Sequence, residues 1–211
     1  MGGVSLNKFL KKTALALSIA LLLGLALWGI QTQRFNYEMN SKFSTSHNWQ
    51  PTLPIVRSLV SDILDGEQRY AQLHRLCYAI SVESHEAGYY STEYALKLNQ
   101  YFFTRTLKYG ERQSLTLPDD IVACQEATMT LYLCFNYLAE QALTFESKGV
   151  SAKDKELLQE VLVVISQLEA AVLSAELPQE IQTKNDVASY LGFFRDNAAL
   201  IRDFHNIILL H

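Results

Sequence analysis

The sequence is poor in residues that interrupt helices: only four of its 211 residues are prolines. Proline removes a backbone donor and breaks the interior of a helix, so its scarcity leaves long stretches free to stay helical. No stretch alternates polar and apolar residues at the period of two that a half-buried strand requires. The pattern therefore predicts the all-α class, and the chain is long enough to bury a core without the help of disulfides or metal ions.

The motifs of the common catalytic and cofactor-binding classes are also missing. The sequence has no G-x-S-x-G, H-E-x-x-H, phosphate-binding loop, G-x-G-x-x-G or haem-type C-x-x-C-H. His74 and Cys77 stand three residues apart, a spacing that can hold a metal ion, but no second pair of this kind follows. The "ESHE" run of residues 83–86 is expected to be the solvated end of a helix before Gly88. We therefore predict no enzyme, no cofactor and no metal site.

Acidic residues are absent from the start of the chain, where the first is Glu38. Three lysines within residues 1–12 precede residues 13–30, which carry no charge. This pattern is typical of a signal-anchor, and the uncharged run has the length that spans a bilayer core. We expect it to be retained, with residues 1–12 in the cytoplasm and the rest outside, which in a bacterium is the periplasm. The alternative is a cleaved signal peptide and a secreted domain.

The remainder of the chain is acidic, with 15 basic against 22 acidic residues once the three N-terminal lysines are set aside. Nucleic-acid affinity depends on lysines and arginines that neutralise phosphates, so nucleic acid is not an expected partner. Residues 31–51 are polar and are expected to link the anchor to a domain at 52–211, with some helix at the start of the linker.

Apolar residues recur at spacings of three and four along the whole of this domain, which predicts amphipathic helices. The expected helices cover about 52–86, 91–109, 118–149, 151–177 and 185–208. Gly88 is expected to end the first, and Ser151 with Asp154 to cap the fourth in a box-like arrangement. Short connections between long helices favour antiparallel neighbours. The prediction is an N-terminal transmembrane helix followed by an antiparallel four- to five-helix bundle.

The three cysteines allow one disulfide outside the cytoplasm. Counted at about 1.5 Å per helical residue, Cys134 returns to nearly the height of Cys77, while Cys124 lies about 15 Å lower. Cys124 and Cys134 are ten residues apart on one helix and too distant to bond. This predicts a Cys77–Cys134 disulfide; the alternative is three buried thiols that pack as small hydrophobes.

Aromatic and apolar residues beyond the core stripes are candidates for a surface that meets a partner. The expected contributors are Tyr89, Tyr90, Tyr94, Tyr101, Arg105, Leu157, Val164, Ile208 and Leu209. Met129 and Leu133 lie off the core stripe in the same way. The alternative is that these side chains fill the bundle's own core.

From these features we expect a single-pass, non-catalytic accessory or scaffold subunit of a cell-envelope complex, acting by protein–protein contact. Its expected partners are the membrane and other envelope proteins, and homo-oligomers stay open. Two alternatives remain: an extracytoplasmic ligand-sensing module that signals through a partner, and a periplasmic inhibitor or immunity-type protein.

Overall fold

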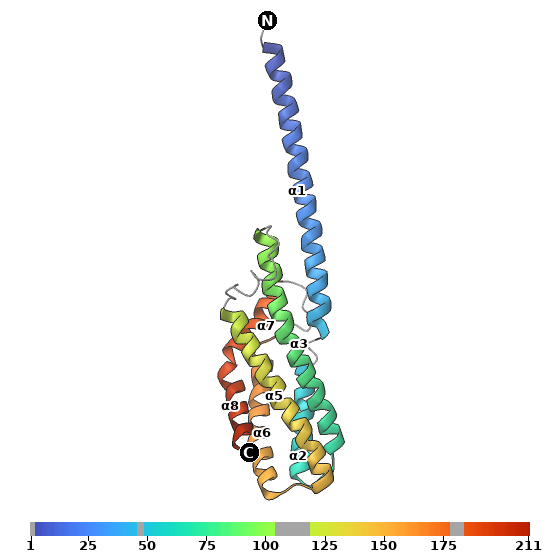
Figure 1. Cartoon of the computed structure of the whole chain (residues 1–211), viewed down its shortest axis with the longest axis vertical. Helices are drawn as coiled ribbons and strands as arrows, with labels where there is room; N and C mark the ends of the chain where they lie inside the picture. Colours follow the sequence, from blue (N-terminus) through green and yellow to red (C-terminus); the bar gives the residue numbers. More distant parts are fainter. Residues whose placement is uncertain (1–2, 46–48, 104–118, 178–183) are drawn as a thin grey trace, which may run out of the picture. The chain divides into compact units, whose positions relative to one another are not determined.

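The structure is a computed structural model of the whole chain, and it describes residues 3–45, 49–103, 119–177 and 184–211 (Figure 1). Within these ranges the chain forms helices and no strand, which confirms the all-α prediction. The helices are α1 (Gly3–Thr45), α2 (Trp49–Leu64), α3 (Tyr70–Phe103), α5 (Asp119–Lys148), α6 (Ala152–Ser174), α7 (Lys184–Asp196) and α8 (Ala198–Leu210). The chain divides into two compact units, Met1–Met39 and Asn40–His211.

The first unit is a single helix with an apolar segment at Lys11–Arg34, whose mean hydropathy is 2.2. Its 24 residues are enough to cross a membrane, and the leucines and Trp28 along it are exposed. The helix continues to Thr45 without interruption, so most of the segment expected as a linker is helical. α6 is also long and apolar enough to pass the same test, but six of its apolar side chains are buried inside the bundle.

The second unit is a ring of helices around one core. α3 contacts α2 and α5, α6 contacts α2 and α8, and α5 closes the ring against α7 and α8. Figure 1 shows successive long helices running in alternate directions, with the α2–α3 and α5–α6 turns at one end. The largest fully buried side chains are Trp49, Tyr190, Phe135, Phe145, Phe194, Phe204, Leu53, Ile63, Leu73, Ile80 and Leu131.

An aromatic cluster joins the start of α2 to α7. The buried Trp49 Nε1 donates a hydrogen bond of 3.2 Å to the hydroxyl of Tyr190. The rings of Phe193 and Phe194 each lie 6.1 Å from the Trp49 ring. Large aromatic side chains bury much apolar area and a buried indole N–H needs a partner, so this cluster fixes the point where the chain enters the bundle.

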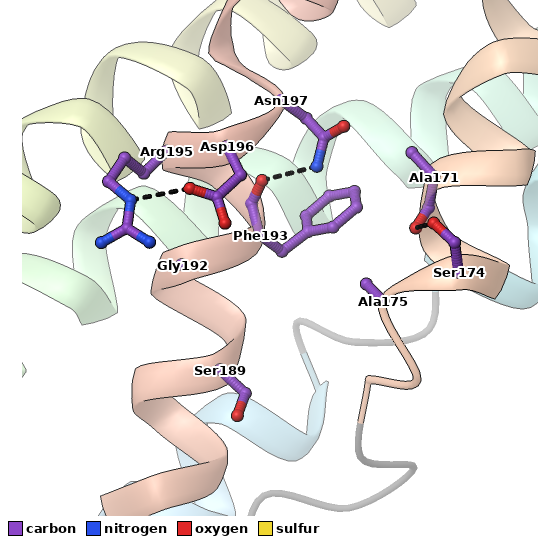
Figure 2. Close-up of a pocket in the computed structure, with 9 residues that line it drawn as sticks. All are labelled: Ala171, Ser174, Ala175, Ser189, Gly192, Phe193, Arg195, Asp196 and Asn197. Carbon is purple, nitrogen blue, oxygen red and sulfur yellow. Dashed lines mark hydrogen bonds and ion pairs between the residues drawn. The ribbon is translucent and has the colours of Figure 1, made fainter.

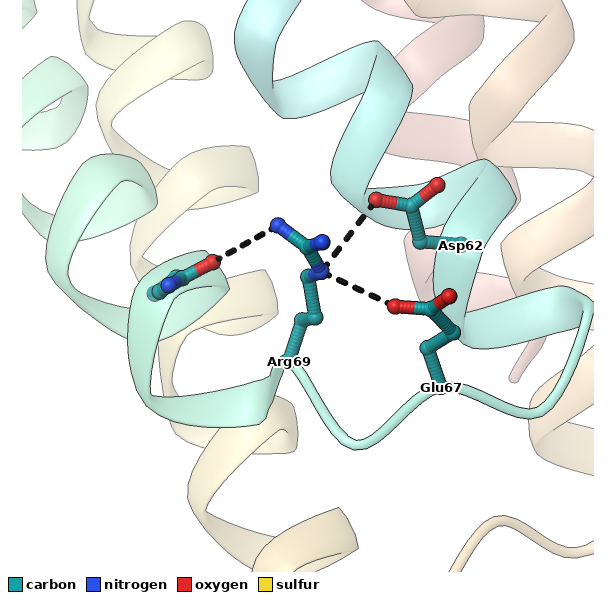
Figure 3. A network of polar contacts seen from close by, with 4 residues as sticks. Asp62, Glu67 and Arg69 are labelled. Carbon is teal, nitrogen blue, oxygen red and sulfur yellow. Dashed lines mark hydrogen bonds and ion pairs between the residues drawn. The ribbon is translucent and has the colours of Figure 1, made fainter.

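The helix expected at 52–86 is in fact two helices, because Gly66 ends α2. Gly66 has a φ of +99°, a conformation that glycine adopts at no steric cost. The Gly66 and Glu67 amides bond back to the carbonyls of Ile63 and Asp62 at 3.1 and 2.9 Å, which is a Schellman cap. Figure 3 shows Arg69 beside this turn, with its Nε 3.1 Å from Glu67 and 3.5 Å from Asp62.

The prediction that Gly88 ends a helix is wrong, because α3 runs through Gly88 to Phe103. A Cβ at this position would lie 2.5 Å from Oγ1 of Thr128 on α5. Glycine is therefore present because two helix backbones approach closely, and not because the helix stops.

The remaining elements agree with the sequence prediction more closely. α5 and α6 cover the expected segments, and Ser151 forms a full capping box with Asp154. The segment expected as one final helix is divided at Asn197 into α7 and α8. The bundle prediction is confirmed in class, while the breaks at Gly66 and Asn197 and the continuation of α3 through Gly88 differ from the predicted helix boundaries.

Candidate functional site

α3 and α5 form the most extensive helix pair of the bundle, and three contacts fix how they are aligned. The rings of Tyr70 and Phe145 lie 6.2 Å apart. Nδ1 of His74 lies 3.0 Å from the carbonyl oxygen of Ala139, and the His85 and Tyr132 rings lie 5.3 Å apart. As numbers rise along α3 they fall along α5, so the helices are antiparallel, and residue 82 lies level with about residue 133.

The side of this pair that faces away from the core carries a second set of apolar and aromatic side chains. On α3 the stripe is Arg75, Tyr78, Val82, His85 and Tyr89, and on α5 it is Glu126, Met129, Leu133, Asn136 and Glu140. We call these ten residues the outer face. All of them are exposed except Asn136, which is half-buried; Tyr89 is 64% and Leu133 46% exposed.

Both outer stripes advance by alternating steps of three and four residues. That spacing keeps side chains on one line along a helix, and in coiled coils it is the spacing of residues that pack against another helix. The core-facing residues of α5, such as Leu131 and Leu138, already form one such line inside the bundle. α5 therefore has two seams, and its own bundle covers only one.

Charge is missing from the middle of the outer face. Residues 127–139 of α5 include no acidic or basic side chain over more than three turns, although Met129 and Leu133 are exposed. On α3 the same holds for residues 76–82. A helix that covers the surface of a soluble bundle normally carries charged residues on its outer side, so this face has the composition of a covered surface.

The "ESHE" run lies in the interior of α3, so the expectation that it forms a solvated helix end is wrong. Ser84 is buried, and its hydroxyl has no hydrogen-bond partner among the residues that the structure describes. Glu83 is half-buried, and burial, followed by repulsion from Glu86, raises the pKa of its carboxyl to about 7. No group of three histidine, cysteine or carboxylate residues that could hold a metal ion occurs among the described residues.

The three cysteines are buried and form no disulfide with one another, so the predicted Cys77–Cys134 disulfide is not formed in this structure. The predicted heights of the cysteines were measured along a single helix that starts at residue 52, whereas α3 begins at Tyr70. With the alignment of α3 and α5 given above, Cys134 is level with residues near 81, about one turn beyond Cys77. Burial raises the pKa of the Cys134 thiol to about 12 and that of the Cys77 thiol further, which makes both poor nucleophiles.

The residues predicted to form an interaction surface divide into three groups. Leu157, Val164 and Ile208 are buried, so they are not available to a partner. The reason is that α6 packs against α2 on one side and α8 on another, which covers both of its apolar faces. Tyr89 and Leu209 are exposed, Leu209 by 70%. Arg105 and the side chains of Tyr90, Tyr94 and Tyr101 lie outside the described part of the structure.

A cavity of about 580 Å³ lies between the end of α6 and the α7–α8 junction (Figure 2). Serine, asparagine and alanine side chains line it together with Phe193, Arg195 and Asp196. The Arg195 Nε is 2.8 Å from the Asp196 carboxylate, and Asn197 donates to the carbonyl of Phe193 at 2.8 Å. The cavity is therefore lined by one ion pair and by small, mostly polar side chains.

No protein-family model, no curated protein and no solved structure matches this chain.

Proposed function

We propose that this protein is a membrane-anchored, non-catalytic subunit of a cell-envelope complex, and that it binds its partner through the outer face of α3 and α5. The observation that carries the proposal is the uncharged, exposed second seam of α5, with Met129 and Leu133 at its centre. Such a face is costly to leave in water and typical of a surface that a partner covers.

The anchor in this proposal is α1. Its apolar segment is long enough to span a bilayer, and Lys8, Lys11 and Lys12 before it favour a cytoplasmic N-terminus. The bundle would then work on the outer side of the inner membrane, in the periplasm if the cell is bacterial. Confinement to a membrane raises the effective concentration of the bundle near a partner in the same membrane, so a modest interface suffices.

Site-specific photo-crosslinking of the full-length chain in the membranes of living cells tests this function. A photoreactive residue at position 133 is expected to yield one discrete crosslinked species. The matched control is position 163 on α6, where Val163 is also an exposed apolar residue, 57% accessible, but lies off the outer face. No adduct at 133, or the same weak adducts at both positions, would refute the proposed role of this face.

A ligand-sensing module is the second candidate, and the cavity between the end of α6 and the α7–α8 junction is the observation that favours it. Its volume is in the range of small-molecule pockets. A compound that raises the melting temperature of the wild-type protein but not of R195A would favour this function over the first.

A further inference from the structure

We infer that the partner on the outer face is a second copy of this chain, packed about a twofold axis that runs parallel to α3 and α5. This inference rests on the proposed function, since it names the occupant of the same face. In this arrangement the α3 outer stripe of each copy lies on the α5 outer stripe of the other, and the two helix pairs form four helices around a shared seam.

The outer stripes of α3 and α5 match each other along their whole length. A twofold axis parallel to the helices keeps every residue at its own height, so each α3 residue meets the α5 residue that is level with it. Val82 then faces Leu133, and Tyr78 faces Asn136. Because both stripes follow the same three-four spacing in opposite directions, their residues stay paired from one end to the other.

The charged residues at one end of the outer face are complementary between the two copies. Arg75 and Glu140 are level with each other at the same end of the outer face, one on each helix, and both are exposed. Arg75 makes no ion pair within the described part of the chain. The twofold axis sets Arg75 of each copy opposite Glu140 of the other, which gives two symmetric contacts of opposite charge at the rim of an uncharged seam.

The outer stripe of α5 contains one uncharged polar side chain, Asn136, between Leu133 and Glu140. A single asparagine in an apolar seam specifies register and oligomeric state at some cost in stability. Its amide nitrogen lies 3.1 Å from Oε1 of Glu140, so it also orients the carboxylate that would receive Arg75 from the other copy.

The direction of the axis agrees with a membrane anchor. A parallel arrangement places Trp49, where each chain enters its bundle, at the same end in both copies. Both chains can then be held in one membrane. An antiparallel pair would place the two entry points at opposite ends.

The test uses two full-length chains with different tags, co-produced in one cell, one carrying V82C and the other L133C. A short bis-maleimide is expected to join V82C to L133C between chains. The chain without introduced cysteines, whose own thiols are buried, and a V163C chain are the controls, and neither is expected to give a crosslinked product.

Charge reversal then tests the axis. In the same cysteine pair, R75E placed in both chains is expected to lower the crosslinked yield by about tenfold, because two attractive contacts become repulsive. E140R placed in both chains has the same expected effect. R75E in one chain and E140R in the other is expected to restore the yield, since each reversed charge then meets its opposite. Only contacts between chains can be rescued in this way.

Three results would overturn the inference. The first is no V82C–L133C product while the photoreactive residue at position 133 still captures a different protein, which leaves the proposed function standing. The second is no adduct of either kind, which ends both. The third is a product whose yield ignores the charge reversals, which contradicts the parallel twofold arrangement. Equal melting temperatures of the variants exclude misfolding as the cause.

Discussion

Replacement of Gly88 by alanine separates two opposing effects in α3. In the interior of a helix, alanine is more favourable than glycine by about 1 kcal/mol. Here, however, the added methyl would lie 2.5 Å from Oγ1 of Thr128, and overpacking of this kind costs about 1–3 kcal/mol. Thr128 is buried and its hydroxyl donates at 2.7 Å to the carbonyl of Cys124, so it cannot move without losing that bond. We expect a net loss of about 1–2 kcal/mol.

The assay is thermal unfolding of the full-length protein, followed by circular dichroism. A loss of this size lowers the melting temperature by about 2–8 °C for a chain of this length. In a T128A background the hydroxyl is gone, and G88A is then expected to be neutral or stabilising by up to about 1 kcal/mol. The double-mutant cycle thus predicts a coupling of about 1–3 kcal/mol. A G88A protein as stable as the wild type, or additive effects in the cycle, would refute the close approach of α3 and α5.

Three further predictions concern the core. Y190F leaves the buried Trp49 N–H without its acceptor and should cost about 1–3 kcal/mol, whereas Y78F, at an exposed position, should cost nothing measurable in the same melt. Glu83 has a pKa raised to about 7, so the stability it contributes is complete below pH 4.5 and is lost as the pH rises through 7. E83Q should remove this part of the pH dependence of the melting temperature, and an unchanged profile would contradict the shift. All three cysteines are buried and in the thiol form; they should react with a maleimide only after denaturation, and an intact mass two hydrogens short would show a disulfide instead.

The sequence was sufficient for the fold class because hydrophobic spacing reports which side of a helix is buried. It placed α5 and α6 well, since Ser151 and Gly149 mark their shared turn. The sequence did not predict the roles of two glycines, because a glycine can either end a helix or allow two helices to approach closely. Gly66 ends a helix with a positive φ and Gly88 makes room for Thr128, and only the neighbours in space distinguish these roles.

The burial of Leu157 and Val164 on α6 was missed for a related reason. Periodicity shows that α6 has two apolar faces, but not that both are covered, by α2 and by α8. Conversely, the uncharged run of α5 was visible in the sequence, and Met129 and Leu133 were already noted as lying off the core stripe. Their significance depended on the alignment of α3 and α5, which three contacts between distant residues define.

The central claim is that the chain stays in a membrane and works there by contact with protein. The most direct test is to purify the full-length protein from native membranes in mild detergent. Mass spectrometry then identifies the intact chain and the proteins that co-purify with it. We predict an uncut chain of 23.9 kDa in a complex of defined stoichiometry, with the partner bound through the outer face. A shortened, soluble and solitary chain would contradict the claim, because it would show that α1 is removed and that the outer face of α3 and α5 is left uncovered.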